Sequence, residues 1–346
     1  MTLLAIESSC DDTSASVLVD GRILSNIIAA QLIHERYGGV VPELASRAHQ
    51  QHIVLVVEQA LTQANVAKSE LSAIAFTRGP GLLGSLLVGA SFAKAFALGL
   101  NIPLIEVNHM QAHVLAHFIR DVPGNAEAEQ DVPRNAGPEF PFICLTVSGG
   151  HTQLVRVDAP LEMHVIGQTQ DDAVGEAFDK SAKLLGLPYP GGPLIDKYAK
   201  MGNPLAYPFP LTEMPGLDFS FSGIKTAIMY FLRDQTRKNP AFVAENLNDI
   251  CASIQHTLVQ MLLKKLVKAT HETGIRQVAI AGGVSANSGL RTSLLALGAE
   301  KNWQVFIPKF EYCTDNAAMI AMAAYFKYQQ NEFVGQEVSP LPRMEL

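Results

Sequence analysis

Two histidines stand four residues apart in residues 107–117 and could bind a metal ion. This segment, VNHMQAHVLAH, predicts a helix, so the imidazoles of His109 and His113 should project from one face. Two neutral imidazoles at this spacing can bind a divalent cation and leave coordination positions open for a third residue and a substrate. Paired histidines on a helix are also common as a polar face or as hydrogen-bonded core groups, so the pair alone does not establish a metal site.

Asp315 is the carboxylate best placed to complete such a site. It precedes a predicted final helix, where aspartate is favoured as an N-cap, and the same side chain could reach a metal. Two histidines and one aspartate suit a first-row metal such as Fe(II) or Zn(II). A further pair of carboxylates, Asp11 and Asp12, could position water, metal or phosphate, or cap the turn in which they lie.

Two glycine-rich segments could contact a nucleotide. Residues 281–287, AGGVSAN, follow a predicted strand and precede a predicted helix, where an α/β fold presents its backbone to a ligand. The paired glycines would let a flat adenosine lie against the chain, and Asn287 could cap the helix or bind ligand hydroxyls. Residues 189–193, YPGGP, are followed by Asp196, whose carboxylate could bind ribose hydroxyls.

Short strands around a polar turn occur twice, about 140 residues apart. The turns are rich in small hydroxyl residues or glycine, which expose backbone N–H groups to an anion. Either turn alone is better explained as a tight turn in an ordinary sheet, but the repetition predicts a duplicated domain with a nucleotide site. The predicted strands are Leu3–Glu7, Ser14–Asp20 and Arg22–Ile28 in the first unit, and Phe142–Val147, Thr152–Val157 and Glu162–Ile166 in the second.

The remaining patterns predict helices, a loop and a tail. Residues 121–138 contain almost no large hydrophobic side chain and predict a mobile surface loop. Residues 337–346 carry prolines and charges and predict a tail. The small residues of Ser85–Leu100 predict close packing against another helix, in this chain or in a partner. The other predicted helices are Asn248–His271, Ser288–Leu297 and Thr314–Phe333.

Length and composition limit the class of protein. A chain of 346 residues predicts two domains or one fold built twice. The first residues lack a basic segment, and no apolar run approaches the length of a membrane span, so a cytoplasmic protein without membrane contact is expected. The four cysteines are widely separated, as in reduced cytosolic proteins. A formal charge of −7 argues against a broad basic surface, so RNA binding would need a local patch or a partner.

In combination, nine short motifs resemble the TsaD (YgjD, Kae-type) tRNA threonylcarbamoyltransferase family. They occur in order over nearly the whole chain, which makes the resemblance far more specific than any single motif. The motifs are ESSCD (7–11), RGPGLLGS (78–85), NHMQAH (108–113), VSGGHT (147–152), GEAFDK (175–180), YPGGP (189–193), FSFSGIKT (219–226), GGVSAN (282–287) and TDNAAM (314–319).

The resemblance implies a duplicated, two-lobed ribonuclease-H-like α/β fold of the acetate kinase, sugar kinase, Hsp70 and actin superfamily. The lobes would be residues 1–120 with 315–336 and residues 139–314, the second with a helical insertion. The implied reaction moves the threonylcarbamoyl group from threonylcarbamoyl-AMP to N6 of the adenosine 3′ of the anticodon, in tRNAs reading ANN codons, and releases AMP.

The resemblance also implies roles for single residues and for partners. His109, His113 and Asp315 would bind one divalent metal, with Fe(II) favoured over Zn(II), and Asp11 would act at the reacting end. Implied partners are a TsaB-like paralogue and a TsaE-like ATPase, and a TsaC-type enzyme would make the adenylate. The residues implied to hold the adenylate are Thr146, Val147, Ser148, Gly149, Gly150, Asp179, Gly192, Asp196 and Asn287.

This sequence departs from the family pattern in two places, and two other functions compete. Position 12 is Asp where the family commonly has Glu, and residues 121–138 are longer than usual. A metallopeptidase would explain the histidines, but the helix lacks the HExxH motif with its general-base glutamate. An ATP-binding scaffold or regulator of the Hsp70 and actin kind would explain the glycine turns but would leave the histidines and Asp315 without a role.

Overall fold

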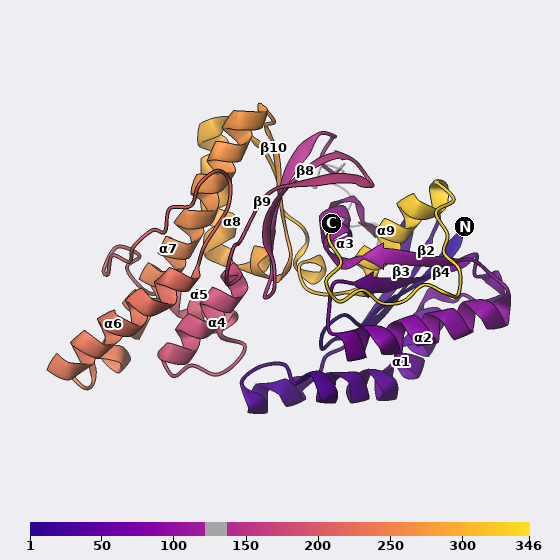
Figure 1. Ribbon diagram of the computed structural model, residues 1–346, viewed down its shortest axis with the longest axis horizontal. Helices are drawn as coiled ribbons and strands as arrows, with labels where there is room; N and C mark the ends of the chain where they lie inside the picture. Colours follow the sequence, from indigo (N-terminus) through magenta and orange to yellow (C-terminus); the bar gives the residue numbers. More distant parts are fainter. Residues whose placement is uncertain (122–136) are drawn as a thin grey trace, which may run out of the picture. The chain divides into compact units, whose positions relative to one another are not determined.

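The computed structural model describes residues 1–121 and 137–346, which form two compact units with one mixed sheet each (Figure 1). Apart from the residues not described, the first unit contains residues 1–139, 159–163 and 314–346, and the second contains residues 140–158 and 164–313. The loop predicted at residues 121–138 lies almost entirely outside the described residues.

The first unit is built on the sheet order β5-β4-β1-β2-β3-β6. β1 pairs antiparallel with β2 and parallel with β4, while β2 pairs antiparallel with β3. The strands are β1 (Thr2–Glu7), β2 (Thr13–Val19), β3 (Arg22–Ala29), β4 (Ala73–Gly79), β5 (Leu104–Asn108) and β6 (Arg120–Asp121); the helices are α1 (Pro42–Ala64), α2 (Leu83–Leu100), α3 (His109–Leu115) and α9 (Ala317–Gln329).

The second unit repeats this arrangement with the order β11-β10-β7-β8-β9. β7 pairs antiparallel with β8 and parallel with β10, as β1 does with β2 and β4. Its strands are β7 (Phe142–Val147), β8 (Thr152–Ala159), β9 (Glu162–Gln168), β10 (Gln277–Ala281) and β11 (Gln304–Phe306); its helices are α4 (Val174–Leu184), α5 (Gly191–Ala199), α6 (Ser222–Lys238), α7 (Phe242–Thr273) and α8 (Ser288–Lys301).

The shared strand order confirms the predicted fold class, a duplicated ribonuclease-H-like α/β fold. Short apolar runs separated by polar or glycine-containing turns explain why the three-strand meander of each unit is evident in the sequence. In contrast, β4 and β5 are short buried strands between helices, and they were not singled out. α1 was also missed; its buried face consists of apolar residues and one histidine, His49.

Helices cover both faces of the sheet in the first unit. In Figure 1, α1 and α2 lie on one face of the sheet, and α9 lies on the other. Residues 317–324 of α9 are all buried, because small alanines let this helix pack closely against the strands. Although α9 follows the second unit in the chain, it therefore belongs to the core of the first.

Within the described ranges, α2 alone has the length and apolar composition of a membrane span, so the expectation that no apolar run approaches this length was wrong. A single helix of this kind is weak evidence for a membrane protein, because the core helices of other proteins pass the same test. The small residues of α2, including Gly89, Ala90 and Ala93, pack on the sheet and on α1. The prediction of close helix packing for Ser85–Leu100 is thus met within the chain.

The C-terminal residues do not form a free tail, so this prediction was wrong. The Leu341 N–H donates to the Arg78 carbonyl at 2.8 Å, and Asn108 Nδ2 donates to the Glu345 carbonyl at 2.8 Å. Gly79 lies against the Leu341 carbonyl with no room for a Cβ atom. Each of these contacts uses a backbone group of the C-terminal segment and is independent of the side-chain pattern of that segment, which explains why the sequence did not reveal them.

Candidate metal site and glycine-rich site

The first candidate site begins where β5 passes into α3. Asn108 caps this helix: its Oδ1 accepts hydrogen bonds from the N–H groups of Met110 and Gln111, at 2.9 and 3.1 Å. This cap places His109 in the first turn and His113 one turn later. The predicted helical spacing of the two histidines is therefore correct.

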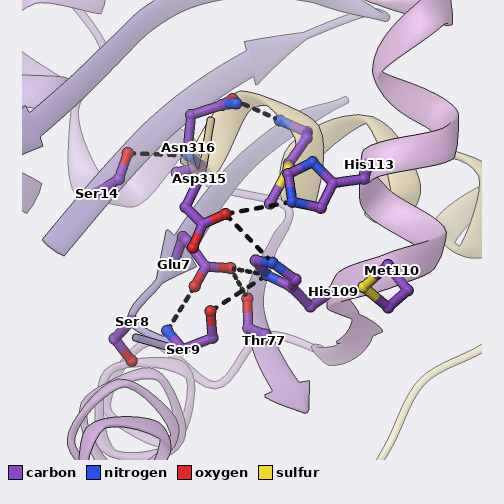
Figure 2. A network of polar contacts seen from close by, with 12 residues as sticks. Glu7, Ser8, Ser9, Ser14, Thr77, His109, Met110, His113, Asp315 and Asn316 are labelled. Carbon is purple, nitrogen blue, oxygen red and sulfur yellow. Dashed lines mark hydrogen bonds and ion pairs between the residues drawn. The ribbon is translucent and has the colours of Figure 1, made fainter. Parts of the chain in front are cut away.

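Asp315 brings a carboxylate to these two imidazoles (Figure 2). Its Oδ1 atom lies 3.3 Å from His109 Nε2 and 3.2 Å from His113 Nε2. The two rings are perpendicular, with centroids 4.6 Å apart, and both histidines are buried. One ligand atom from each of the three residues lies within 4.8 Å of the others.

This donor set fits a divalent metal ion. Ligand atoms at about 2.1 Å from a tetrahedral metal lie about 3.4 Å from one another. The 3.3 and 3.2 Å separations between Asp315 Oδ1 and the two imidazole nitrogens are close to that spacing. His109 Nδ1 is engaged by Glu7, so Nε2 is the nitrogen that His109 offers to an ion.

Strong charge coupling holds the metal-free cluster together. Burial alone would lower the pKa of His109, but the negative charges of Asp315 and Glu7 outweigh it and raise this pKa to about 10. Burial would raise the pKa of Asp315 and Glu7, yet the charge of His109 and its hydrogen bonds lower both. Burial lowers the pKa of His113. A divalent cation bound here would replace the positive charge of the His109 imidazolium.

The predicted helix cap at Asp315 was wrong. The N-cap of α9 is Asn316, whose Oδ1 accepts a hydrogen bond from the Met319 N–H at 3.0 Å. The N–H of Ala317 donates instead to Ser14 Oγ at 2.9 Å. Because Asn316 takes the capping role, the Asp315 carboxylate is left to face the histidines.

Asp11 lies in the turn between β1 and β2, and two helices fix this turn. The Cys10 carbonyl accepts hydrogen bonds from Ser85 Oγ of α2 and His49 Nε2 of α1, both at 3.0 Å. His49 Nδ1 also lies 2.8 Å from Thr13 Oγ1. Burial, together with the charges of Asp11 and Asp315, raises the pKa of the Cys10 thiol, so Cys10 is not a ready nucleophile.

Asp12 predicts a pH-dependent stability. Burial, followed by the charges of Asp11, Asp315 and Glu7, raises the pKa of Asp12 from 3.8 to about 7. Because the folded-state pKa lies above the unfolded one, ionising Asp12 costs stability; this cost is absent well below about pH 4, grows up to about pH 7 and is constant above. We expect Asp12→Asn to stabilise the metal-free protein by about 1–2 kcal/mol at about pH 8, after allowance for partial exposure, and by much less at about pH 5.

Thermal melting of both proteins at the two pH values measures this difference. A gain in Tm of the same size at both pH values would contradict the role assigned to ionised Asp12. Asp20→Asn is a suitable control, because the Asp20 carboxylate lies at the surface beside the N-terminal amine.

The second candidate site lies at the carboxyl ends of β7 and β10, which are parallel neighbours. Ser148 and His151 close the turn after β7: the Ser148 N–H donates to the His151 carbonyl at 2.8 Å, and the His151 N–H donates to Ser148 Oγ at 3.0 Å. Gly149 and Gly150 are exposed, with open space where a Cβ would lie. The side chains of Thr146 and Val147 are buried, so these residues offer only backbone groups.

Asp179 holds the second glycine pair in place. Its Oδ1 accepts hydrogen bonds from the N–H groups of Gly191 and Gly192, at 2.8 and 3.0 Å. Burial raises the pKa of Asp179, although these two hydrogen bonds oppose the rise. The carboxylate of α4 thus orders the start of α5.

Asp196 and Asn287 meet at the start of α8. Asp196 Oδ1 accepts hydrogen bonds from Ser288 N and Oγ, at 3.1 and 2.7 Å. Asn287 Oδ1 accepts one from the Leu290 N–H at 2.9 Å, so Asn287 caps α8, one of its two predicted roles. Asn287 Nδ2 donates to Gln255 Oε1 at 2.8 Å. Contacts among β7, α4, α5 and α8 therefore gather the nine predicted residues at one end of the second sheet.

Sequence reasoning missed three side chains that organise these sites. Glu7 was noted only as the end of a predicted strand and the first residue of the ESSCD motif, although a lone acid ending a buried strand is itself a signal. His49 and Gln255 lie on the long helices α1 and α7, where the sequence does not distinguish a buried polar residue from one on the exposed face. Their roles depend on contacts with residues 32 or more positions away.

Comparison with known proteins identifies the relatives of this chain. The family model for TsaD, tRNA N6-adenosine threonylcarbamoyltransferase, matches residues 22–322. A protein of that name from Cytophaga hutchinsonii is 63% identical over 346 residues, which cover 100% of this chain and 97% of the relative. A protein of the same name from Christiangramia forsetii is 62% identical over 343 residues, which cover 99% of this chain and 98% of that relative.

Solved structures show likeness of fold alone. Full-length HypF in its phosphate- and nucleotide-bound form aligns with a TM-score of 0.60 at 13% identity, covering 95% of this chain and 46% of HypF. Component A of the (R)-2-hydroxyglutaryl-CoA dehydratase of Acidaminococcus fermentans aligns with a TM-score of 0.51 at 15% identity. The alignment covers 95% of this chain and 99% of component A.

Proposed function

The chain belongs to the tRNA N6-adenosine threonylcarbamoyltransferase family, and we propose that His109, His113 and Asp315 hold one divalent metal ion that serves this transfer. The convergence of the three ligand atoms is the observation that carries the proposal. A metal ion held there would bind oxygens of the threonylcarbamoyl group and polarise its carbonyl.

The enzyme is an acyltransferase that modifies tRNA, forming threonylcarbamoyladenosine. In the proposed reaction the donor is threonylcarbamoyl-AMP, and the acceptor is N6 of the adenosine 3′ of the anticodon in tRNAs reading ANN codons. A bond forms between N6 and the carbamoyl carbon, the bond from that carbon to the phosphate oxygen breaks, and N6 loses a proton. Because AMP is a good leaving group, orientation of the reactants matters more than a strong nucleophile.

Residues of the first unit act at the reacting end. Asp11 accepts a hydrogen bond from the N6 amine and orients it. The hydrogen bonds from Ser85 and His49 to the Cys10 carbonyl support this role, because they fix the turn that carries Asp11. The first lobe in this proposal comprises residues 1–120 and 315–336.

Residues of the second lobe, 139–314, hold the adenylate. The loop Thr146–Gly150 holds the phosphate through the backbone N–H groups of Gly149 and Gly150, where nothing lies in the space of a Cβ atom. Thr146, Val147 and Ser148 position this turn, because the Ser148 N–H already donates to the His151 carbonyl. Asp196 binds ribose hydroxyls, and Asn287 adds a further polar contact. Asp179 acts through Gly192, because its carboxylate orders the glycine turn against which the nucleotide lies.

The cofactor and partners complete the proposal. Mixed nitrogen and oxygen ligands suit Fe(II), which we favour, and also Zn(II). A TsaB-like paralogue and a TsaE-like ATPase assist the enzyme in the cytoplasm. Since the net charge is −7, such partners would supply part of the positive surface that tRNA binding needs.

Transfer of labelled threonine carbon to tRNA tests the proposal. Purified threonylcarbamoyl-AMP, tRNA, the cognate partner proteins and metal-loaded enzyme are combined, with His109→Ala in parallel. We expect label on the anticodon-adjacent adenosine with the wild type and at least a 100-fold lower rate with the variant, because a metal ligand is lost.

Two results would contradict this function. A His109→Ala protein that is metal-free by elemental analysis and still transfers normally would remove the metal from the reaction. A wild type that binds both tRNA and the adenylate without transferring label would favour an ATP-binding scaffold.

A further inference from the structure

Glu7 is a buried carboxylate at the end of β1, and three hydrogen-bond donors surround it. Its exposed fraction is 1%, and the preceding strand residues are buried hydrophobic side chains. Oε1 accepts a hydrogen bond from the Ser9 N–H, and Oε2 accepts one from Thr77 Oγ1 of β4. Oε2 also lies 3.1 Å from His109 Nδ1. Burying a carboxylate is costly unless partners of this kind compensate it.

The contact with Glu7 selects one tautomer of His109. An ionised carboxylate only accepts hydrogen bonds, so Nδ1 of the imidazole must carry a hydrogen. The lone pair of the neutral ring is then on Nε2, the nitrogen that lies 3.3 Å from Asp315 Oδ1. Figure 2 shows Glu7 and Asp315 both directed towards the His109 ring, where Glu7 contacts Nδ1 and Asp315 contacts Nε2.

His113 has no comparable support. Its Nδ1 atom is buried without a hydrogen-bond partner among the described residues. Besides packing, only the contact of its Nε2 with Asp315 Oδ1 at 3.2 Å orients the His113 ring. His109 also faces Asp315 through Nε2, but its Nδ1 has two further contacts, with Glu7 Oε2 at 3.1 Å and Ser9 Oγ at 3.2 Å. This asymmetry makes His109 the ring whose orientation one substitution can change.

We propose that Glu7 is a positioning residue that fixes the tautomer and orientation of His109 for metal binding. The inference rests on the proposed function, because it takes the histidine and aspartate cluster as a metal site. Carboxylates that hold a ligating histidine raise metal affinity by about 10-fold to 100-fold. Glu7 is expected to act within that range without touching the substrate.

Glu7→Gln is the informative variant. All three partners of Glu7 donate hydrogen bonds, and glutamine replaces one accepting oxygen by a donating NH2 group. Either the NH2 group faces the Ser9 N–H and that contact breaks, or it faces Thr77 and His109. In the second case the Thr77 hydroxyl can turn to accept, but the protonated Nδ1 of His109 cannot. The side chain keeps its shape and loses a buried charge, so the metal-free protein should not be strongly destabilised.

Zn(II) affinity is measured with a competing chelator for the wild type and Glu7→Gln, together with urea unfolding of the metal-free proteins. We expect the Zn(II) affinity of Glu7→Gln to fall about 10-fold to 100-fold. This fall should be larger than the loss of folding stability measured by urea unfolding can explain. Nitrogen-15 NMR of the His109 ring in the Zn(II) form should show protonated Nδ1 in the wild type and a changed Nδ1 signal in the variant.

Ser16→Ala is the matched control. Ser16 is buried in the same sheet and donates a hydrogen bond to the Ser25 carbonyl at 2.7 Å, remote from the metal ligands in sequence. Loss of this hydrogen bond should lower the free energy of unfolding and leave the Zn(II) affinity unchanged. If Glu7→Gln fails to fold, Thr77→Val removes one partner of the carboxylate, and a several-fold loss of affinity is expected.

The outcomes separate this inference from the function on which it rests. A wild type that binds no Zn(II) would overturn the metal site itself. If the wild type binds Zn(II) and folded Glu7→Gln binds it equally well although its His109 Nδ1 signal has changed, the positioning role is wrong. If that signal is unchanged, the amide oxygen still faces His109, and Thr77→Val decides. In the fallback experiment, equal affinity of Thr77→Val and the wild type would likewise count against it.

Discussion

Gly282→Ala is expected to destabilise the protein by about 3 kcal/mol or more. The backbone of Gly282 has φ 87° and ψ 166°, a conformation that only glycine adopts readily and that costs other residues about 1–3 kcal/mol. A Cβ atom would also lie 2.5 Å from the Val147 carbonyl oxygen, in a buried central strand that cannot move away cheaply. Urea unfolding followed by circular dichroism measures the loss.

Gly283→Ala is the matched control in the next position. No atom lies within 4 Å of a Cβ placed there, and the backbone conformation is open to alanine. Its stability should stay within about 0.5 kcal/mol of the wild type, whereas its affinity for AMP should fall if adenosine lies against this glycine. Equal destabilisation by both substitutions would contradict the strain argument.

Asp315→Asn is expected to abolish metal binding and transfer. The substitution keeps the size of the side chain but replaces an anionic ligand by a neutral amide, while two imidazoles remain. We expect metal affinity to fall at least about 100-fold, which corresponds to about 3 kcal/mol, and transfer to fall to background. Elemental analysis after metal loading and gel filtration measures the first effect, and labelled-threonine transfer measures the second.

The surface carboxylate of Asp20 again provides a control, since Asp20→Asn removes the same charge without touching the metal ligands. That variant should retain one metal ion and full activity. One equivalent of tightly bound metal in Asp315→Asn would show that Asp315 is not a ligand.

The sequence predicted the parts of the sites that depend on local spacing. His109 and His113 share a face because a helix repeats every 3.6 residues, and this relation survives any tertiary packing. Glycine turns after strands were equally evident, because few other residues allow such a close approach of backbone. The histidine pair was therefore correctly predicted on a helix, and the glycine turn at residues 281–287 was correctly predicted between a strand and a helix.

The rest depended on choices between neighbouring residues and on long-range contacts. Asp315 and Asn316 are both favoured as helix caps, and only packing against Ser14 decides which one turns away. The partners of Glu7 and His49 come from other elements, so no periodic pattern marks them. The contact of Asp315 with His113 joins residues 202 positions apart, so spacing could not predict it. It was expected only because the motifs NHMQAH and TDNAAM resemble those of one family.

The position of Asp315 just before α9 also determines when the three ligands of the proposed metal site are all present during synthesis. A ribosome that has made residues 1–313 has added every described strand of both sheets and two of the three ligands, but Asp315 and the helix that follows are still missing. Until then the nascent first unit exposes the apolar strand surface that α9 later buries. The proposed metal site is therefore completed late in the synthesis of each chain, and prematurely terminated chains lack its third ligand.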